Sequence, residues 1–222
     1  MSRWEELFQT LRAEDFTLFA VAETHLRDLE EPPPNAGWHW AGCNRTEGSR
    51  KGGGVGVLWR SNTTWTRLEG SCNEHMWISG ELLGMPVILG VMYLSVARVE
   101  DVGNCQIVEC IKKDVIRWAE GKQVLLMGDF NGHIQPLDGH QDVNGSLLVQ
   151  LAEDLSLEVT NLRPNCEGMV TWCARNSQSC IDYALVSRKL AMHIARVHID
   201  ESGQYSVGSD HNRIKLTLVA SA

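Results

Sequence analysis

The sequence has no long hydrophobic run and no leader-like N-terminus. Its longest apolar stretch, residues 87–97, is interrupted by Gly90, Tyr93 and Ser95 and falls well short of the ~18 residues of a membrane-spanning helix. The first residues do not follow the pattern of positive charge and then apolar residues that marks a secretory signal. We therefore expect neither a membrane partner nor secretion for this chain.

The sequence also lacks close cysteine pairs. It contains seven cysteines, an odd number, and no C-x-x-C pair. Cys166, Cys173 and Cys180 are evenly spaced, but a tetrahedral zinc site needs closer pairs and a fourth ligand. The cysteine pattern therefore favours free thiols in a reducing, intracellular compartment over a disulfide framework or a zinc site.

The sequence also lacks an excess of positive charge. The 222 residues carry 20 Lys and Arg against 28 Asp and Glu, a net charge of −8, and no cationic run is longer than a pair. Bulk electrostatics therefore do not attract this chain to nucleic acid. Any nucleic-acid function must depend on a local surface or on a bound cation, and nuclear targeting must come from elsewhere.

The glycine motifs of nucleotide-binding proteins are missing too. The glycine run at residues 52–54 does not continue into a dinucleotide fingerprint, and no P-loop motif occurs. The run is more consistent with a flexible start to a strand. Three basic residues precede it and are our first choice for contacts with a DNA backbone, with plain solubility as the alternative: Arg45, Arg50 and Lys51.

Composition and patterning predict one domain that spans residues 1–222. Hydrophobic residues make up 43% and charged residues 22%, which is ordinary for a globular protein, and no linker divides the chain. Strands and helices that do not alternate strictly favour two sheets with helices outside. Apolar spacing predicts helices at residues 3–13, 105–119 and 147–155. Strands are expected at residues 18–22, 55–60, 63–67, 77–83, 87–94, 124–127, 170–172, 181–186 and 214–219.

Polar residues gather at the ends of apolar strands, where sites on sheet scaffolds form. Glu23 follows the first predicted strand, Gly-Asp-Phe-Asn at residues 128–131 ends another, and Ser-Asp-His at residues 209–211 precedes the last. Each of these alone is more typical of a helix cap or a turn. Asp182, inside an otherwise apolar strand, is harder to explain structurally because a buried carboxylate needs a partner.

Together these residues have the chemistry of metal-assisted phosphodiester hydrolysis. Glu23 and Asp210 offer the hard oxygen ligands that Mg²⁺ prefers. His211, paired with a carboxylate such as Asp182, can hold or relay a proton near neutral pH. The reaction also needs an in-line water and donors to the scissile group. Asp129 and the asparagine two residues later can supply these.

The motifs follow one another in a specific order along the chain. They are residues 22–25 (Ala-Glu-Thr-His), 52–56 (Gly-Gly-Gly-Val-Gly), Tyr93, 128–131 (Gly-Asp-Phe-Asn), 171–172 (Thr-Trp), 181–183 (Ile-Asp-Tyr) and 209–211 (Ser-Asp-His). This order resembles the endonuclease/exonuclease/phosphatase superfamily. Within it, residues 16–219 look like the endonuclease domain of a non-LTR (LINE-type) retrotransposon. The resemblance implies an α+β fold, a four-layered α-β-β-α sandwich of two mixed sheets like that of DNase I.

The resemblance also implies a metal site and an activity. Glu23 would be the principal Mg²⁺ ligand, with Asp210 near or on the metal, and Mn²⁺ is the alternative ion. The family activity is the nicking of one DNA strand to leave a 3′-hydroxyl that primes reverse transcription. As such a domain, the chain would be a monomeric part of a larger polyprotein with reverse transcriptase and would act in the nucleus.

Further implied roles surround the scissile phosphate. Tyr93 and Asn131 would contact the phosphate, and Asp129 would position or activate the attacking water. His211, oriented by Asp182, would stabilise or protonate the groups around the phosphate. The resemblance leaves open how Asp129 and His211 share the activation of water and the protonation of the groups around the phosphate.

Residues next to the motifs are expected to bind the substrate. Thr171 and Trp172 form the Thr-Trp pair of the resemblance, and Arg175 follows them on an expected loop. We expect these three residues to contact DNA, together with the three basic residues before the glycine run. The preference for a target sequence is not readable here, because loops read the shape and the bases of DNA in ways that one sequence does not expose.

One departure from the family pattern concerns the start of the chain. Family members begin with a strand that carries an asparagine of the metal site, whereas this sequence opens directly at the first helix. We expect an N-terminally truncated domain, in which the loss of a strand from inside one sheet leaves unpaired backbone groups and exposed apolar surface.

Two other functions stay open. One is a different phosphodiesterase of the same superfamily, either an abasic-site repair nuclease or a phosphatase acting on lipid or inositol head groups. The other is a catalytically impaired, DNA-binding remnant, which the missing first strand suggests.

Overall fold

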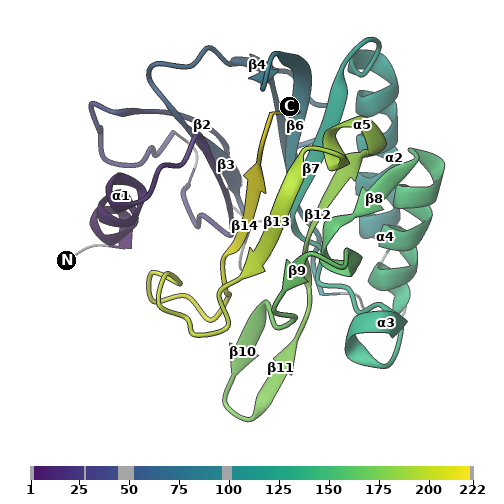
Figure 1. The fold of residues 1–222 in the computed structure, drawn as a ribbon. Coiled ribbons are helices and arrows are strands. Elements are labelled where there is room, and N and C mark those ends of the chain that lie inside the picture. The colour runs from purple at the N-terminus through teal and green to yellow at the C-terminus, as the bar shows by residue number, and fades with distance from the viewer. Residues whose placement is uncertain (1–2, 28, 45–52, 97–101, 221–222) are drawn as a thin grey trace.

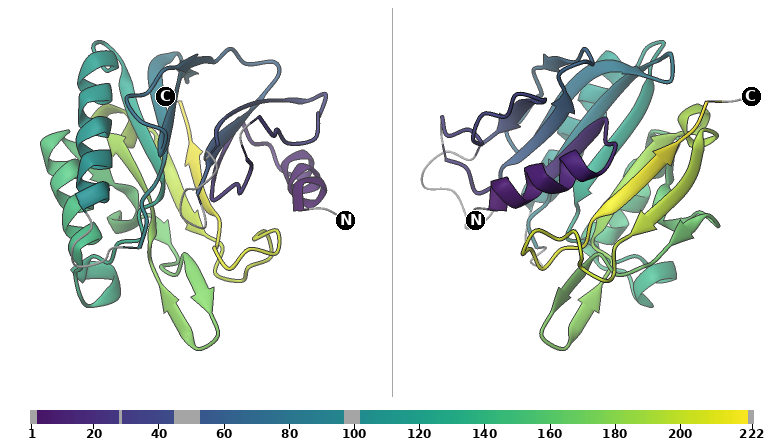
Figure 2. Two further views of the ribbon diagram at one scale, coloured as in Figure 1. Left: turned by 180° about the vertical axis from the view of Figure 1, so that it is seen from behind. Right: turned by 60° about the vertical axis from the view of Figure 1, so that its left-hand side comes forward.

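Helices cover the outer faces of two layers of β-sheet (Figure 1). The computed structural model describes residues 3–27, 29–44, 53–96 and 102–220, and no helix in these ranges is long and apolar enough to cross a membrane. The fold is the α+β, four-layered α-β-β-α sandwich that the resemblance implied (Figure 2). Its layers are helices α2 (Val102–Trp118) and α4 (Val143–Asp154), a six-stranded sheet, two three-stranded sheets, and helix α1 (Arg3–Ala13).

The six-stranded sheet forms the middle of the molecule. Its strand order is β4-β5-β6-β7-β12-β8, in which β6 and β7 are parallel and the other neighbours are antiparallel. Helix α2 makes the crossover that two parallel strands require. The strands are β4 (Thr66–Leu68), β5 (His75–Leu82), β6 (Met85–Tyr93), β7 (Gln123–Asp129), β8 (Leu157–Val159) and β12 (Asp182–Ser187).

The second layer consists of two three-stranded sheets. The first has the order β1-β3-β2 and is antiparallel, and the second has the order β14-β13-β9 with β13 and β9 parallel. The hairpin β10–β11 extends away from the body (Figure 1). The strands are β1 (Leu18–Ala22), β2 (Trp38–Cys43), β3 (Val55–Arg60), β9 (Cys166–Glu167), β10 (Trp172–Ala174), β11 (Ser177–Ser179), β13 (Ile194–Ile199) and β14 (Ile214–Leu218). Three short elements connect them: α3 (Gln135–Asp138), α5 (Arg188–Ala191) and the 3₁₀ turn Thr160–Leu162.

Alternate side chains of the central strands fill two separate cores. Val87, Leu89 and Val91 of β6 pack against the small sheets, whereas Ile88 and Met92 pack under α2 and α4. Both faces of this strand are therefore buried, which explains why it is a continuous apolar run rather than an alternating one. This burial holds β6 firmly in the sheet, so that its last residue, Tyr93, is fixed beside Asp129 at the end of β7.

The sequence patterns did not predict β2 and β13. In β13, the pairing with β14 shifts between Ile194 and Arg196, so that the buried residues do not follow a simple two-residue period. In β2, the buried residues are Trp38 and Ala41, three positions apart, and this spacing is not typical of a strand. Both strands depend on their neighbours for their conformation.

One backbone edge of β1 and one of β14 have no strand partner among the described residues. β1 is hydrogen-bonded to β3 on its other side, and β14 is hydrogen-bonded to β13. A groove of about 680 Å³ lies between them and is lined by all five residues of each strand. The structure thus contains unpaired edges of the kind that we expected, whereas the truncation itself stays a prediction.

Glu14, in the connection between α1 and β1, is ion-paired with residues at the start of β14. Its carboxylate lies 2.8 Å from Arg213 Nη1 and 2.5 Å from Lys215 Nζ. Burial alone would raise the pKa of Glu14, but the hydrogen bonds from Lys215 and Arg213 outweigh burial and lower the pKa below its usual value of 4.5. A lowered pKa contributes stability above the usual value, and this stability is lost as the pH falls through the folded-state pKa.

We therefore expect Glu14→Gln to destabilise the protein in a pH-dependent way. At neutral pH the free energy of unfolding should fall by about 2 kcal/mol, because charge-assisted hydrogen bonds contribute roughly that much. In acid, where Glu14 is protonated, the two proteins should differ much less. Urea denaturation at both pH values measures the difference, with Glu6→Gln on the exposed face of α1 as the control. An equal loss at both pH values would contradict the ion-pair explanation.

Candidate active site

Two carboxylates meet where β7 and β12 lie side by side. Asp129 is the last residue of β7, Asp182 is the first of β12, and the two are directly opposite in the antiparallel register. Opposite residues project from the same face with Cβ atoms about 5 Å apart. Because like charges in this arrangement repel, the pair needs a proton or a cation nearby.

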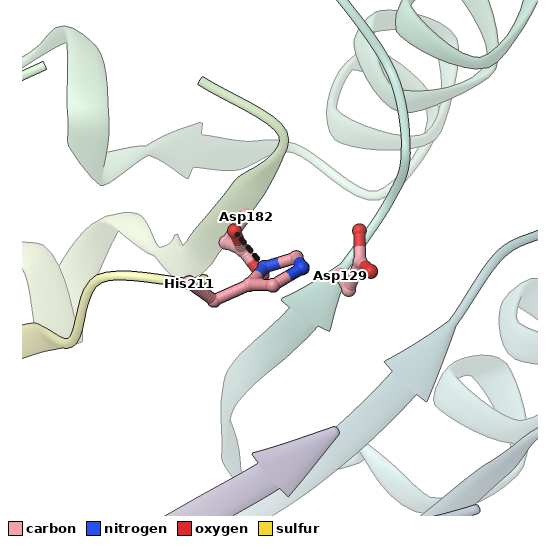
Figure 3. Close-up of side chains that lie close together, drawn as sticks. All are labelled: Asp129, Asp182 and His211. Atoms are coloured by element: carbon pink, nitrogen blue, oxygen red, sulfur yellow. Dashed lines mark hydrogen bonds and ion pairs between the residues drawn. The ribbon is translucent and has the colours of Figure 1, made fainter. Parts of the chain in front are cut away.

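His211 reaches this pair from the loop before β14. Its Nδ1 lies 2.9 Å from Asp182 Oδ2 and 3.1 Å from Asp182 Oδ1. Figure 3 shows the other ring nitrogen turned toward Asp129. Ligand atoms of Asp129, Asp182 and His211 all lie within 4.8 Å of one another. The structure therefore brings together three residues that belong to three separate sequence motifs.

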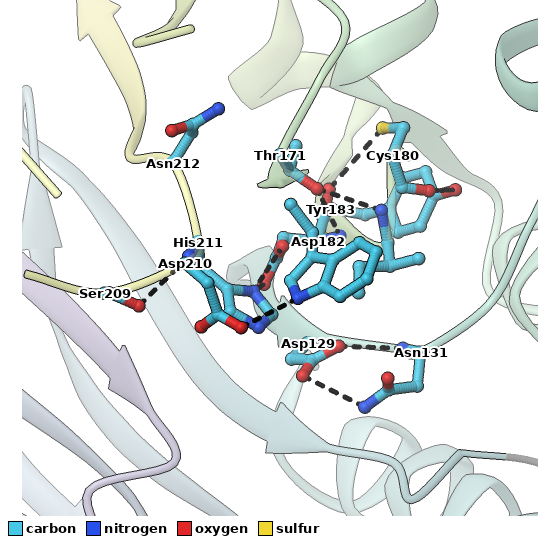
Figure 4. Close-up of polar contacts among 12 residues, drawn as sticks. Asp129, Asn131, Thr171, Cys180, Asp182, Tyr183, Ser209, Asp210, His211 and Asn212 are labelled. Atoms are coloured by element: carbon cyan, nitrogen blue, oxygen red, sulfur yellow. Dashed lines mark hydrogen bonds and ion pairs between the residues drawn. The ribbon is translucent and has the colours of Figure 1, made fainter. Parts of the chain in front are cut away.

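The loop that carries His211 is tied to the start of β10. The N–H of Cys173 donates to the carbonyl of Asp210 at 2.9 Å, and the N–H of Asn212 donates to the carbonyl of Thr171 at 2.6 Å. Figure 4 shows how closely these segments lie together. These backbone hydrogen bonds to the start of β10 fix the position of His211 relative to the carboxylates.

Trp172 holds the side chain of Asp210. The indole Nε1 donates to Asp210 Oδ2 at 3.0 Å, which leaves Oδ1 as the oxygen available to a ligand. We expected Trp172 to contact substrate, but its N–H is used here to orient a candidate metal ligand. A contact between the indole ring and DNA stays a prediction.

Thr171 supports the site from inside the protein. Its side chain is completely buried, and its hydroxyl accepts the N–H groups of Ile181 at 2.9 Å and Asp182 at 3.0 Å. We expected Thr171 to bind substrate, whereas a hydroxyl with no exposed surface cannot touch DNA in this structure. Its contacts instead fix the backbone from which the Asp182 carboxylate projects.

Thr171→Val is therefore expected to destabilise the protein although it hardly changes the shape of the side chain. Valine leaves the N–H groups of Ile181 and Asp182 buried without an acceptor, at a cost of about 3 kcal/mol in the free energy of unfolding. Chemical denaturation measures this loss, and Thr66→Val on the exposed edge strand β4 should leave stability nearly unchanged. Equal stability of the two variants would show that other acceptors replace the Thr171 hydroxyl.

Asn131 forms a tight turn beside Asp129. Its backbone N–H donates to Asp129 Oδ1 at 2.8 Å, and its Nδ2 donates to Asp129 Oδ2 at 3.0 Å and to the carbonyl of Leu94 at 2.8 Å. Its φ of 44° is left-handed, a conformation that asparagine tolerates better than most residues. One amide hydrogen thus positions Asp129, and the other ties the turn to the backbone at Leu94. The expected contact of Asn131 with phosphate stays a prediction and requires one of these bonds to be exchanged.

Two buried asparagines that the sequence analysis did not single out hold the same turn. Asn144 Nδ2 donates to the carbonyls of Phe130 and Asn131 at 3.0 Å each, and Asn144 Oδ1 accepts from Asn104 Nδ2 at 2.9 Å. Asn104 lies in α2 and Asn144 in α4, and both are almost inaccessible to solvent. The available signal was an asparagine near the start of each apolar helix, since a buried amide needs partners.

Glu23 directly follows β1 in a strained conformation. Its φ of 51° is left-handed, which is rare for glutamate and is found preferentially at functional sites. The N–H groups of Thr24 and His25 hold the turn by donating to the carbonyls of Gly54 and Gly53 at 3.1 and 3.2 Å. The Glu23 side chain lines the same groove as the carboxylates above and accepts no hydrogen bond from the described part of the chain.

The site carries a surplus of negative charge. Burial raises the pKa of Asp129 well above its usual value, and the charge of Asp182 raises it further. Burial alone would lower the pKa of His211, but its hydrogen bond with Asp182 and the surrounding carboxylates outweigh burial and raise the pKa to about 9. His211 is therefore positively charged at neutral pH, facing more carboxylates than one imidazolium can neutralise.

The other expected site residues lie at different distances from this cluster. Tyr93 ends β6 beside Asp129 in the parallel register and is 6% exposed. Arg175 lies in the exposed turn of the hairpin β10–β11 with a φ of 54°. Three expected DNA contacts lie outside the described residues: Arg45, Arg50 and Lys51.

The oxygen donors of the site fit a hard divalent cation. Among the described residues, none donates a hydrogen bond to the Glu23 carboxylate, and none donates to Oδ1 of Asp210. Carboxylates of this kind are the ligands that Mg²⁺ and Mn²⁺ prefer. Burial and, after it, the charge of Asp182 raise the pKa of Asp129, and a cation would offset the repulsion between these two carboxylates.

Comparison with known proteins agrees with this chemistry. The sequence profile of the Endonuclease/Exonuclease/phosphatase family matches residues 4–211. The chain belongs to this family. Members of the endonuclease/exonuclease/phosphatase family are nucleases and phosphatases that hydrolyse phosphate esters, typically with a metal ion. No significant relative is found among curated protein sequences.

Solved structures of the endonuclease/exonuclease/phosphatase type share the fold. The endonuclease domain of TRAS1, a telomere-specific non-LTR retrotransposon, superposes with a TM-score of 0.76 at 15% identity, over 97% of this chain and 92% of that chain. The AP endonuclease LMAP from Leishmania major gives 0.75 at 14% identity, over 96% and 81%. The mannosyl-6-phosphatase Bt3783 from Bacteroides thetaiotaomicron gives 0.65 at 14% identity, over 98% and 90%. At these identities the likeness establishes the fold alone.

Proposed function

We propose that this chain is a Mg²⁺-dependent endonuclease that nicks DNA and leaves a 3′-hydroxyl for target-primed reverse transcription. The observation that carries the proposal is the meeting of Asp129 with the His211–Asp182 pair, in the same groove as Glu23 and Asp210. This arrangement combines a group that can activate water, a positive charge for the phosphate and oxygen ligands for a cation.

Each residue of the cluster has a task in this reaction. Asp129, held by the turn at Asn131, orients the attacking water and accepts its proton. His211 directs its positive charge at the phosphate oxygens, and Asp182 keeps the imidazole in place through Nδ1. When bound by Glu23 and Asp210, Mg²⁺ supplies charge neutralisation at the phosphate and at the leaving oxygen. The positive charge of His211 opposes the rise that burial causes in the pKa of Asp129 and so favours the ionised form that a base requires.

DNA is the partner that we propose for this site. Support comes from two similar structures, those of a retrotransposon endonuclease domain and of an AP endonuclease. In this proposal, residues 1–222 form one monomeric domain of a larger reverse-transcriptase polyprotein that acts in the nucleus. Arg175 and the basic residues at 45, 50 and 51 contact the DNA backbone. The net charge of −8 then leads us to expect weak, metal-dependent and salt-sensitive binding.

Nicking of supercoiled plasmid tests the proposal. We expect open-circular product with Mg²⁺, no product above background after chelation with EDTA, and recovery when Mg²⁺ or Mn²⁺ is added in excess. A DNA polymerase should extend the nicks directly, because the proposed product is a 3′-hydroxyl. A known active nuclease serves as the positive control. If the plasmid stays intact under all of these conditions while the control nicks it, the proposal is wrong.

A second candidate is another phosphodiesterase or phosphatase of the family. The similar structures include an AP endonuclease and a sugar phosphatase, so the fold by itself does not choose among these substrates. Parallel assays on plain DNA, on DNA with an abasic site and on a soluble phosphodiester separate the three. Preference for plain DNA supports the retrotransposon-type activity, and preference for abasic DNA or for the soluble ester replaces it.

The third candidate, a catalytically impaired DNA-binding remnant, gives a different result. Such a remnant binds DNA in a gel-shift assay but does not nick plasmid. Adding a family-like N-terminal strand with its asparagine then distinguishes a silenced enzyme from a decayed one. A large gain in nicking indicates a silenced enzyme, and no gain favours the remnant.

A further inference from the structure

A cluster of thiol, imidazole and carboxylate groups lies outside the candidate active site, between helix α2 and the start of β5. It consists of Cys72 in the turn before β5, His75 as the first residue of β5, and Cys110 and Asp114 in α2. Cys110 and Asp114 are four positions apart, so both project from the same face of the helix. The proposed nuclease reaction uses none of these four residues.

Asp114 fixes the orientation of the His75 ring. Its Oδ2 lies 2.6 Å from His75 Nε2 and also accepts the backbone N–H of Ser71 at 2.9 Å and the indole N–H of Trp77 at 3.2 Å. A carboxylate oxygen that accepts two other N–H groups acts as an acceptor for the ring as well, so Nε2 carries the ring proton. The lone pair of Nδ1 is therefore available, and Nδ1 faces Cys72.

The Cys72 thiol and the His75 ring form a close pair. Cys72 Sγ is 3.1 Å from His75 Nδ1, and two residues separate them in the chain, a spacing within the range of paired zinc ligands. Burial lowers the pKa of His75 below its usual value of 6.5 even though Asp114 opposes this, so the ring is neutral at neutral pH. A neutral imidazole with one nitrogen held by a carboxylate is the usual form of a metal-bound histidine.

A second thiol, that of Cys110, lies beside Cys72. Burial raises the pKa of Cys72 to about 11, and the charge of Cys110 and a hydrogen bond with it contribute to the rise. The hydroxyl of Ser71 donates to the carbonyl of Cys110 at 3.1 Å, which ties the turn to the helix. Two sulfur atoms and one ring nitrogen thus converge between the turn and α2, in contrast to the carboxylate oxygens of the candidate active site.

We propose that Cys72, His75 and Cys110 bind one Zn²⁺ ion, with a water from solvent as the fourth ligand. Thiolate and imidazole ligands favour Zn²⁺ and disfavour Mg²⁺, which prefers oxygen. Binding releases one proton from each thiol to solvent, so two thiolates balance the charge of the ion. Ser71 is exposed and both cysteines are half-buried, which leaves a path from solvent to the site.

The geometry needs only side-chain movement to accept the ion. Tetrahedral ligands at ~2.3 Å (sulfur) and ~2.0 Å (nitrogen) from zinc are about 3.5 Å apart, so the 3.1 Å between Cys72 Sγ and His75 Nδ1 must widen by about 0.4 Å. Cys110 moves further, because among the described residues only the cluster around Asp129 has three ligand atoms that all lie within 4.8 Å of one another. A rotation of Cys110 about its Cα–Cβ bond to another staggered position supplies this movement.

Two other uses of these groups fit the structure less well. Cys72, His75 and Asp114 are connected like the nucleophile, base and orienting acid of a cysteine hydrolase. His75 is only 1% exposed, however, and a thiol with a pKa of about 11 is almost entirely protonated at neutral pH. The same protonation slows the formation of a disulfide between Cys72 and Cys110, since the attacking group is a thiolate. A divalent cation removes this obstacle because its charge stabilises the thiolates.

Metal bound here fixes a turn that also contacts β2 and β6. The N–H of Tyr93 donates to the carbonyl of Glu74 at 3.1 Å, and the Sγ of Cys43 donates to the carbonyl of Asn73 at 3.3 Å. The turn therefore connects two sheets with α2. Because zinc binds the folded chain at a site that the turn and the helix build together, zinc should raise the temperature of thermal unfolding.

Cobalt(II) is the spectroscopic probe for this site, because it takes the place of zinc and absorbs in the near ultraviolet when bound to thiolate. We expect one equivalent of cobalt per reduced chain to saturate this absorption. One equivalent of zinc should abolish it, and excess Mg²⁺ should not. Cobalt at the carboxylates of the candidate active site does not produce a thiolate band. Absence of the band would overturn the proposal.

Serine variants locate the bound ion. Cys72→Ser and Cys110→Ser should each weaken zinc binding at least a hundredfold, since loss of a direct ligand exceeds the usual effect of losing a group that orients one. Cys105→Ser, at an exposed position of the same helix, should bind zinc as the unaltered chain does. Zinc should raise the unfolding temperature of Cys105→Ser but not that of Cys72→Ser. An unchanged cobalt band in a folded Cys72→Ser variant would place the ion elsewhere.

Alkylation of the unaltered protein decides the question if the serine variants do not fold. Zinc should slow the reaction of iodoacetamide with Cys72 and Cys110 at least tenfold, as measured by mass spectrometry of each cysteine, and should leave Cys105 unaffected. Equal rates with and without zinc would overturn the site. A Cys72–Cys110 disulfide that forms in air as readily with zinc as without it would also overturn the site. None of these readouts depends on nicking, so the proposed function and the zinc site are tested separately.

Discussion

His211→Ala is expected to lower the rate of plasmid nicking about a thousandfold, within the range for the loss of one fixed donor at the reacting group. The imidazolium faces Asp182 at 2.9 Å and has a pKa raised to about 9, so it provides the positive charge of the cluster at neutral pH. Its removal leaves Asp129 and Asp182 without a charged partner and leaves the phosphate without a donor. The measurement is the initial rate of open-circle formation at saturating Mg²⁺.

Two further variants serve as a control and as a test of the residue that orients His211. His39→Ala removes an exposed histidine of the edge strand β2 and should leave nicking unchanged. Asp182→Asn keeps the imidazole but weakens its orientation, and we expect a loss of about 10–100-fold, as is usual for groups that orient a catalytic residue. If a folded His211→Ala variant retains more than a tenth of the activity, the histidine does not act on the phosphate.

Gly128→Ala is expected to prevent stable folding. Gly128 is opposite Met92 in the parallel pair of β6 and β7 and has a φ of 151°. A Cβ at this position lies 2.0 Å from the carbonyl oxygen of Met92, which is a backbone atom of a buried strand and has no room to move. We expect a loss of about 4 kcal/mol or more in the free energy of unfolding. Solubility on expression and urea denaturation measure this effect.

Gly84→Ala is the matched control for this substitution. Gly84 also has a positive φ, 74°, but an added Cβ meets no atom within 4 Å. The control therefore carries the conformational strain without the clash, and we expect a loss of about 1 kcal/mol. Similar stabilities of the two variants would show that β6 and β7 can separate. The glycine before Asp129 would then not be required for the close approach of these strands.

The strands that the sequence predicted best are those whose burial is local and regular. The strands at residues 18–22 and 55–60 were predicted with the observed bounds, and the first helix likewise. The pattern was less informative for β13, where a shift in pairing interrupts the period, and for the supporting roles of Thr171 and Asn144. These roles arise from contacts between segments that are distant in sequence.

The candidate site could be predicted as a set of residue types but not as a geometry. Residue types at the ends of apolar strands, together with the order of the motifs, singled out Glu23, Asp129, Asp182 and His211 as candidates for chemistry. These signals did not reveal that Thr171 is buried beneath Asp182 or that both amide hydrogens of Asn131 are bound. A single residue type serves equally well as a substrate contact or a buried support, and only its surroundings decide between them.

The sequence by itself determined the local quantities of this protein: the direction of side chains along each strand, the glycines that close turns require, and the carboxylates and histidine available for chemistry. The tertiary structure decided which of these meet. His211 lies 29 residues from Asp182 in the chain, yet the register of β12 with β7 and the hydrogen bonds from β10 bring its Nδ1 to 2.9 Å from that carboxylate. The unpaired edges of β1 and β14 are likewise a property of sheet order. The reason is that side-chain alternation is set within one strand, whereas register and strand order are set by packing between distant segments.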